Sequence, residues 1–266
     1  MNSEQPWRLA LIGASLGHSA SPKLFADLFK ASGVEGSYDL LPFPDADAVQ
    51  SFLTSPDAGA FDGFNVTVPY KALCAGLCDA LTPRAAAIGA VNVLLPKAGG
   101  GFVGDNTDGV GFMESIRPFL ASQHERALIL GRGGAAMAAA HGLQTLGIDV
   151  VHLVRDLDPS PSPQRLELRF ADLKPEVVQA FLLVVQATPV GMWPNVEQCP
   201  PFLYETLGEA HLCVDLVYNP PLTAFLKKAQ GQGATILNGQ GMLTQQASGA
   251  WKAFQLNRLQ RFGTAD

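Results

Sequence analysis

The sequence has little charge and lacks the signatures of several protein classes. Charged residues make up 16% of its 266 residues and hydrophobic residues 47%, a balance that argues against intrinsic disorder. The net charge of -6 gives no basic excess, so we expect no nucleic-acid partner. No apolar run approaches the roughly 20 residues that span a bilayer, and no basic leader precedes an apolar segment at the amino terminus. We therefore expect a soluble cytoplasmic protein without membrane contact.

Cysteine is also scarce, and its spacing indicates no metal site. The chain has four cysteines, none of them in a CxxC pair. Cys74 and Cys78 are spaced to share a helix face, but no second pair and no histidine cluster completes a zinc site. We expect reduced thiols and no bound metal.

Short apolar runs alternate with helix-like segments along most of the chain, which is the pattern of an α/β fold with parallel sheets. The predicted strands are 9–12, 37–41, 64–68, 127–130, 150–154, 181–185, 211–215 and 234–237, with a hairpin of 91–95 and 101–103 around the glycines at 99–101. One helix is predicted to begin near Pro22, and further helices are predicted over 46–53, 109–120, 135–146 and 242–259. The segment 156–164 has three prolines and is predicted as a loop, and the polar stretch 121–126 is a candidate entry to a second domain.

The segment GRGGAA, residues 131–136, lies between a predicted strand and an alanine-rich helix. This is the arrangement of a dinucleotide-binding turn. Gly131 permits a tight turn, Gly133 lets the backbone approach a pyrophosphate, and the helix amino end offers unpaired N–H groups. Ala136 stands where a third glycine is usual, so the match to the full motif is partial.

The residue after the next strand bears on which dinucleotide is bound. Arg155 stands where an NAD site usually has an acidic residue, and a guanidinium suits the 2′-phosphate of NADP. Arg132, inside the glycine turn, adds positive charge. Asp156 is an alternative partner for a ribose hydroxyl, and a solvated role for Arg155 is also open. The residues favour NADP and leave NAD possible.

Three segments of the first half gather polar residues after predicted strands: 13–22, 65–71, and 90–92 with 104–109. In a parallel sheet such loops line the ligand crevice. Their hydroxyls and amides suit a substrate with several hydroxyl groups and a carboxylate, and Lys71 and Asp108 supply an ionisable pair for moving a proton at a carbonyl or alcohol carbon. Structural alternatives stand beside this hypothesis: Ser19 or Ser21 as a helix cap, Lys71 as a surface lysine, and Asp108 as a turn residue.

Taken together, the chain resembles the shikimate dehydrogenase family. The resemblance is carried by GASLGHSASP, GFNVTVPYK, AIGAVNVL, GDNTDGVGF, LGRGGAA, QATPVGM, DLVYNP and GQGMLTQQA, in that order and over most of the chain. Members of the family reduce 3-dehydroshikimate to shikimate with NADPH, and close relatives also oxidise quinate.

The resemblance implies a role for each matching position. Lys71 and Asp108 would be catalytic and flank the reacting oxygen. The implied substrate-binding residues are Ser19 and Ser21 at the carboxylate, with Thr67, Asn92, Gln246 and Tyr218. The implied cofactor-binding residues are Gly131, Arg132, Gly133, Gly134, Ala135, Arg155, Thr188, Gly239 and Met242.

The resemblance also implies a domain organisation. Residues 1–108 and 239–266 would form a three-layer α/β substrate domain, and 109–238 a Rossmann domain that binds NADP, with the active site in the cleft between them. The protein would act on a small molecule, as a monomer or homodimer.

Several positions depart from the family pattern. Phe25 and Ala26 replace a usual His-Asn pair, Val154-Arg155-Asp156 replaces Asn-Arg-Thr, Gln186 replaces an asparagine, and Met137 replaces an arginine. These changes lie mainly on the cofactor side and indicate a divergent paralogue. Two alternatives remain open: a quinate/shikimate dehydrogenase that accepts NAD, and a non-catalytic sensor that binds shikimate.

Overall fold

A computed structural model describes residues 5–160 and 165–263. The chain divides into two compact units, one formed by Met1–Thr107 with Gln246–Asp266 and the other by Asp108–Gln245. The chain therefore passes from one unit to the other twice, first after Thr107 and again after Gln245.

The first unit contains a six-stranded sheet in the order β2-β1-β3-β5-β6-β4. Strand β1 pairs in parallel with β2 and β3, β5 is antiparallel to β3 and β6, and β4 is parallel to β6. The strands are β1 (Trp7–Gly13), β2 (Gly36–Pro42), β3 (Gly63–Val66), β4 (Ala80–Leu81), β5 (Val93–Pro96) and β6 (Phe102–Asp105). The antiparallel pair β5 and β6 confirms the predicted hairpin.

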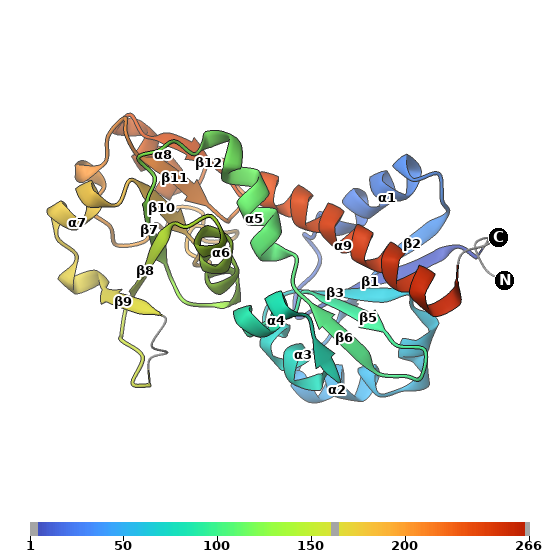
Figure 1. Cartoon of the computed structure of the whole chain (residues 1–266). Helices are drawn as coiled ribbons and strands as arrows, with labels where there is room; N and C mark the ends of the chain where they lie inside the picture. The colour runs from blue at the N-terminus through green and yellow to red at the C-terminus, as the bar shows by residue number, and fades with distance from the viewer. Residues whose placement is uncertain (1–4, 161–164, 264–266) are drawn as a thin grey trace. The chain divides into compact units, whose positions relative to one another are not determined.

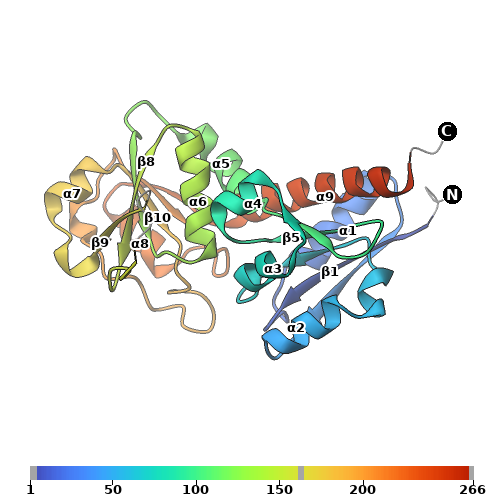
Figure 2. The ribbon, with the colours of Figure 1, turned by 60° about the horizontal axis from the view of Figure 1, so that its bottom comes forward.

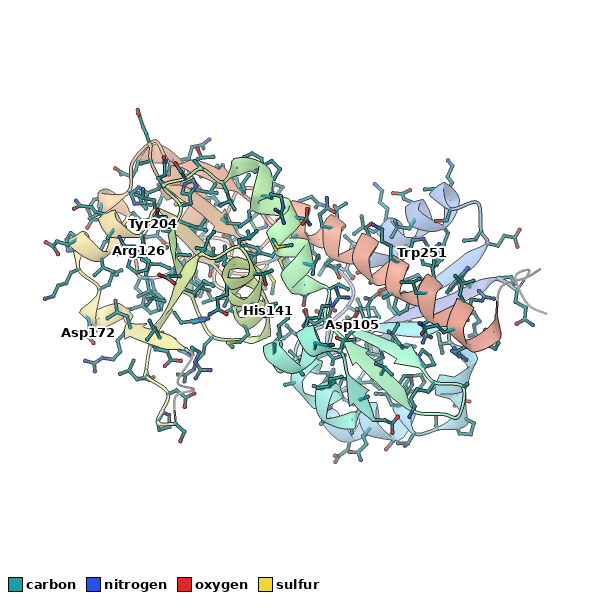
Figure 3. The ribbon with its side chains drawn as sticks, in the orientation of Figure 1. Asp105, Arg126, His141, Asp172, Tyr204 and Trp251 are labelled. Atoms are coloured by element: carbon teal, nitrogen blue, oxygen red, sulfur yellow. The ribbon has the colours of Figure 1, made fainter. Side chains whose placement is uncertain are left out.

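Helices cover both faces of this sheet, as Figure 1 shows. They are α1 (Ser21–Ala31), α2 (Ala46–Leu53), η1 (Pro56–Ala60), α3 (Lys71–Leu77), α4 (Pro83–Ile88) and the last helix, α9 (Gln240–Phe262). Because side chains alternate along a strand, Leu9 of β1 packs with α1 and α9, whereas Ala10 packs with α2 and α3. On the α9 side, Trp251 meets the ring of Trp7 edge-on at 4.6 Å (Figure 3). The result is a three-layer α/β unit.

The second unit contains a six-stranded parallel sheet in the order β12-β11-β10-β7-β8-β9. This is the strand order of the doubly wound dinucleotide-binding fold. Its switch point lies between the central strands β7 and β10, because the chain adds later strands outward from β7 on one side and from β10 on the other. The strands are β7 (Arg126–Leu130), β8 (Asp149–Val154), β9 (Leu166–Arg169), β10 (Leu183–Gln186), β11 (Leu212–Asp215) and β12 (Thr235–Leu237).

Helices again cover both faces of the second sheet, with α6 and α7 on opposite sides in Figure 2. They are α5 (Asp108–Ile116), η2 (Arg117–Phe119), α6 (Gly134–Thr145), η3 (Phe170–Asp172), α7 (Pro175–Ala180), η4 (Tyr204–Thr206) and α8 (Ala224–Gly231). Ile129 of β7 packs with α5 and α6, and its neighbour Leu128 packs with α7 and α8. The predicted α/β class is confirmed in both units.

Two predictions about element boundaries are wrong. The helix predicted over 109–120 ends at Ile116 and continues as the 3-10 turn η2, which contains Pro118 and so cannot continue the α-helical hydrogen bonds. The polar stretch 121–126 does not open the second unit. That unit begins at Asp108, because Phe112 and Ile116 of α5 are fully buried in its core.

The loop predicted over 156–164 is irregular as far as Ser160, and residues 161–164 lie outside the described part of the chain. The sequence interpretation also missed α3, α4, α7, α8 and β9, all short elements.

Candidate functional site

Three polar side chains of the first unit, distant in sequence, form one hydrogen-bonded group. Asn92 Nδ2 donates to Thr107 Oγ1 at 3.1 Å and lies 3.4 Å from Gln246 Oε1. Thr107 in turn donates its amide to Asn92 Oδ1 at 2.8 Å and its hydroxyl to the backbone oxygen of Gln246 at 3.1 Å. The structure therefore brings together two of the predicted substrate-binding residues, Asn92 before β5 and Gln246 in α9, which lie 154 positions apart.

The group extends across the sheet through Asn65. Asn65 Nδ2 donates to the backbone oxygen of Asn92 at 3.2 Å, and its Oδ1 accepts from the Tyr38 hydroxyl at 2.8 Å. Burial raises the pKa of Tyr38, with a smaller opposing effect from a hydrogen bond to Ser21. Tyr38 thus stays a neutral phenol that links the start of α1 to the polar group around Asn92.

Ser19 and Ser21 lie at the start of α1. The Ser21 amide donates to Ser19 Oγ at 3.2 Å, and the residue between them, Ala20, provides no side-chain cap. The interpretation of Ser21 as the helix cap is wrong, because Ser21 is already the first helical residue and Ser19 accepts the backbone amide.

Thr67 follows β3 at the same edge of the sheet. Its amide donates to Ile12 of β1 at 2.9 Å, and its methyl group fills the space over Gly13, where an added Cβ would lie 2.6 Å from Thr67 Cγ2. Gly13 ends β1, so a side chain there would displace Thr67. The half-buried side chain of Thr67 is therefore packed against Gly13, after the carboxyl ends of the parallel strands β1 and β3.

Lys71 and Asp108 each open a helix. Lys71 is the first residue of α3, is half-buried, and its backbone oxygen accepts from Val91 at 2.9 Å. Asp108 is the first residue of α5 and is 5% exposed. Asp108 is the one acidic residue in the first turn of α5.

An ion pair between the half-buried Arg84 and the buried Asp105 holds the segment that leads to Asp108. Asp105, at the end of β6 (Figure 3), is 3% exposed and accepts from Arg84 Nε at 2.7 Å, with a second contact to the same guanidinium. It also accepts from Thr82 Oγ1 at 2.6 Å and from the Asn106 amide at 2.8 Å. Burial alone would raise the pKa of Asp105, but Arg84 and Thr82 outweigh it and lower the pKa.

The glycine turn after β7 requires a glycine at its first position. Gly131 has a φ of +105°, and an added Cβ would lie 3.0 Å from Thr188 Cγ2. Gly133 caps α6 without a side-chain hydrogen bond, and nothing lies within 4 Å of its missing Cβ. The 12-residue helix begins at Gly134, and the amides of its first turn have no partner within the helix, which is the arrangement that suits an anion.

His152 supports this turn from the neighbouring strand β8. Its Nδ1 lies 2.8 Å from the Gly131 carbonyl oxygen, which can only accept, so Nδ1 carries the proton. Burial lowers the pKa of His152 and favours the neutral ring. The sequence interpretation did not include this residue, since a histidine inside an apolar strand carries no motif.

Gln186 organises the loop after β10. Its Oε1 accepts from the amide of Thr188 at 2.6 Å and from the Thr188 hydroxyl at 2.7 Å, while its Nε2 donates to the backbone oxygens of Thr188 and Val190. Gln186 is fully buried and thus replaces the usual asparagine in a structural role. The Thr188 methyl group faces Gly131, so this loop and the glycine turn adjoin.

The remaining predicted residues lie around β11 and the start of α9. Tyr218 is half-buried and follows β11, whose last residue, Asp215, accepts from the Val217 amide at 2.9 Å and the Thr223 hydroxyl at 2.5 Å. Gly239 has a packing requirement of its own, because an added Cβ would lie 2.1 Å from the Leu216 backbone oxygen. Met242 is 9% exposed and contributes to the core around α5 and α6.

The two arginines predicted at the cofactor site differ in their surroundings. Arg155 is exposed directly after β8. Arg132 Nη1 donates to the Asp156 backbone oxygen at 3.0 Å and also pairs with Glu167 Oε2 at 3.3 Å. The sequence interpretation did not predict the pairing of Arg132 with Glu167, because it missed strand β9.

Within the part of the chain that the structure describes, no cluster of three or more His, Cys, Asp or Glu side chains is arranged to hold a metal ion. Nor does any helix among the described residues have both the length and the apolar character to cross a bilayer.

The strand order of the second unit and its glycine turn define the class of two-unit α/β proteins that bind a dinucleotide. The profile of the shikimate dehydrogenase substrate binding domain matches residues 11–94. The NADP(+) shikimate dehydrogenase of Maridesulfovibrio salexigens is 34% identical, over 89% of this chain and 86% of that protein. The chain belongs to the shikimate dehydrogenase family.

Solved structures agree with this assignment. The shikimate 5-dehydrogenase of Thermus thermophilus in complex with NADP(H) and shikimate matches with a TM-score of 0.81 and 31% identity, over 93% of each chain. The quinate dehydrogenase of Corynebacterium glutamicum in complex with NAD matches with a TM-score of 0.83 and 27% identity, over 94% of this chain and 93% of that one.

Proposed function

We propose that this protein is a shikimate dehydrogenase that reversibly reduces 3-dehydroshikimate to shikimate with NADPH. Family membership and the NADP-bound relatives support the proposal. The observation that carries it is the polar group of Asn92, Thr107 and Gln246, which joins a strand end to the last helix of the first unit. Its neutral donors and acceptors suit the hydroxyl groups of a polyhydroxylated acid.

Lys71 and Asp108 are the residues to which we assign proton transfer. The hydride for C3 of the substrate would come from bound NADPH. As the carbonyl oxygen gains negative charge, the Lys71 ammonium donates a proton to it, and in the reverse direction the amine accepts that proton. Asp108 is assigned to a substrate hydroxyl, from which its carboxylate would accept a hydrogen bond.

For the substrate, we assign the carboxylate to the hydroxyls of Ser19 and Ser21. Ser19 is the more accessible of the two, whereas Ser21 is 9% exposed. The ring hydroxyls and the carbonyl side are assigned to Thr67, Asn92 and Gln246, and Tyr218 is also assigned to substrate binding. The substrate would then bind to the first unit and the dinucleotide to the second, and the second unit also contains Asp108 and residues 239–245, which the sequence interpretation gave to the substrate domain.

For the cofactor, the pyrophosphate is assigned to the turn of Gly131 and Gly133 and to the amides at the start of α6, Gly134 and Ala135. Arg155, with Arg132 nearby, is assigned to the 2′-phosphate, because a guanidinium can make two parallel hydrogen bonds to phosphate oxygens. Thr188, Gly239 and Met242 are assigned to the nicotinamide end.

A second candidate is a dehydrogenase that oxidises quinate with NAD. Two observations favour it: Asp156, exposed beside Arg155, suits a free ribose diol, and the likeness to an NAD-bound quinate dehydrogenase extends over nearly the whole chain. Against it, the assignment of two serines to the substrate carboxylate favours shikimate, because their hydroxyls would leave little room for the additional hydroxyl of quinate.

Initial-rate kinetics with shikimate and quinate, each with NADP and NAD, test the proposal. We expect the highest kcat/KM with shikimate and NADP, and a loss of kcat of about a hundredfold or more in Lys71→Ala, because general acid-base catalysis contributes roughly that factor. Lys97→Ala is the matched control, since Lys97 pairs with the exposed Asp79 at 3.2 Å in the hairpin. A preference for quinate with NAD supports the second candidate. Shikimate binding without turnover would instead indicate a sensor.

A further inference from the structure

An ion-pair network joins the glycine turn of the second unit to the edge strand β9. Arg132, the second residue of the turn, lies with Nη1 3.3 Å from Glu167 Oε2. Glu167 Oε1 lies 2.8 Å from Arg165 Nε, and Arg165 also pairs with Asp158. The Asp158 amide donates to Glu167 Oε2 at 2.8 Å. Glu167 is therefore the central residue of a network that reaches the loop after β8.

Glu167 is an anion held in a nearly buried position. Its side chain is 4% exposed, against 38% for Arg132. Burial alone would raise the pKa of Glu167, but the Asp158 amide and the two arginines outweigh it and lower the pKa. In the parallel register of β8 and β9, Glu167 lies opposite His152, which contacts the Gly131 carbonyl oxygen. Its charge therefore lies close to the glycine turn.

This position gives Glu167 an influence on how the adenosine end of a dinucleotide is recognised. In the doubly wound fold the residues after the second strand recognise the 2′ position of the ribose. Here Arg155 follows that strand, β8, and Arg132 donates to the Asp156 backbone oxygen, so these two residues would hold a 2′-phosphate. The Arg132 guanidinium already pairs with Glu167, so a phosphate has to compete with that carboxylate. The carboxylate also repels the phosphate directly. A ribose with two free hydroxyls experiences neither effect.

We propose that Glu167 is a specificity-determining residue that weakens the preference for NADP over NAD by holding Arg132 in an ion pair. The inference rests on the proposed function for its link to catalysis, but its chemistry concerns only the second unit. Arg155 supplies one positive charge for the 2′-phosphate, and Glu167 limits the contribution that Arg132 makes to binding that phosphate.

Glu167→Gln tests this directly. Glutamine has the same length and can still accept the Asp158 amide, but it removes the charge that holds Arg132. Calorimetric titration with adenosine 2′,5′-bisphosphate and with 5′-AMP measures the contribution of the 2′-phosphate without any turnover. We expect the ratio of the two affinities to shift about three- to tenfold towards the bisphosphate, as for one partly exposed charge pair. The ratio of kcat/KM for NADP and NAD should shift in the same direction.

Two further variants make the outcome specific. Glu176→Gln removes the same charge from the exposed first turn of α7 and should leave both ratios within about twofold of the wild type. In an Arg132→Ala background, Glu167→Gln should have less than half its effect, because the released partner is missing. Thermal unfolding of each variant establishes that it is folded.

An unchanged or lowered bisphosphate preference in folded Glu167→Gln overturns the inference. So does an undiminished effect in the Arg132→Ala background, which would exclude Arg132 as the mediator. If the nucleotide preference shifts as expected but shikimate is not turned over, the inference stands and the proposed function fails. If neither nucleotide binds, the inference and the cofactor assignment fail together.

Discussion

Asp215 gives the fold a stability that depends on pH in a direction opposite to that of most carboxylates. It is fully buried at the end of β11, and burial raises its pKa from the ordinary value of 3.8 to about 6, although Thr223 and the Val217 amide partly oppose this. Because the pKa is higher in the folded state, the neutral acid is the form that folding favours. The stabilisation is complete below about pH 4 and is lost as the pH rises through about 6.

The size of the effect follows from the pKa difference. A rise from 3.8 to about 6 makes the ionised carboxyl cost about 3 kcal/mol in the folded state, at ~1.4 kcal/mol for each pH unit. Asparagine has the shape of the neutral acid and cannot ionise. Asp215→Asn should therefore be close to the wild type in unfolding free energy at about pH 4 and more stable by up to about 3 kcal/mol at about pH 7.

Urea unfolding followed by circular dichroism at several pH values measures this difference. The quantity of interest is the variant-minus-wild-type free energy against pH, since other titrating groups cancel in the difference. Asp149→Asn, at an exposed aspartate of β8, is the control and should show no such slope. A flat difference for Asp215→Asn between about pH 4 and 7 would refute the reasoning.

Three further variants test features of the same structure. Gly239→Ala places a methyl group 2.1 Å from the Leu216 backbone oxygen, so we expect a loss of about 2–4 kcal/mol, measured as a lower Tm. Arg84→Met leaves the buried Asp105 without its cation and should lower the free energy of unfolding in urea by about 1–3 kcal/mol at neutral pH. The loss should be smaller at acid pH, where Asp105 is protonated, and Arg84→Lys should recover part of it. Gln246→Ala should raise the KM for shikimate about tenfold with a smaller effect on kcat, measured by initial rates, and an unchanged KM would exclude Gln246 from the site.

The main elements of both sheets could be predicted because buried strands are short apolar runs, whichever unit they belong to. The missed helices α3 and α4 have 7 and 6 residues, fewer than two turns, so an apolar face cannot repeat. Strand β9 was missed for a different reason. It lies at a sheet edge, alternates apolar and charged residues, and exposes 63% of Leu166, so its four residues carry no apolar run.

Some residues of the candidate site could be predicted from the sequence and others could not. Motifs in the sequence identified Asn92, Gln246 and the glycine turn, because each lies in a segment with a recognisable pattern. The partners that hold them were not predictable. Arg84 and Asp105 lie 21 positions apart and Arg132 and Glu167 lie 35 apart, and each pair meets only through the register of folded strands and helices. Such pairs follow from the sheet topology and leave no local signal.

The last helix has a consequence for the order in which the chain folds during synthesis. Trp251 and Phe254 of α9 complete the core of the first unit against Trp7 and Phe25, and the Phe254 ring lies over Gly63. The second unit draws its sheet from one continuous stretch, whereas the first needs residues of α9 that follow the whole of that stretch. During synthesis the sheet of the second unit is therefore made before the first unit can bury the apolar surface that α9 covers, although the strands of the first unit are made earlier.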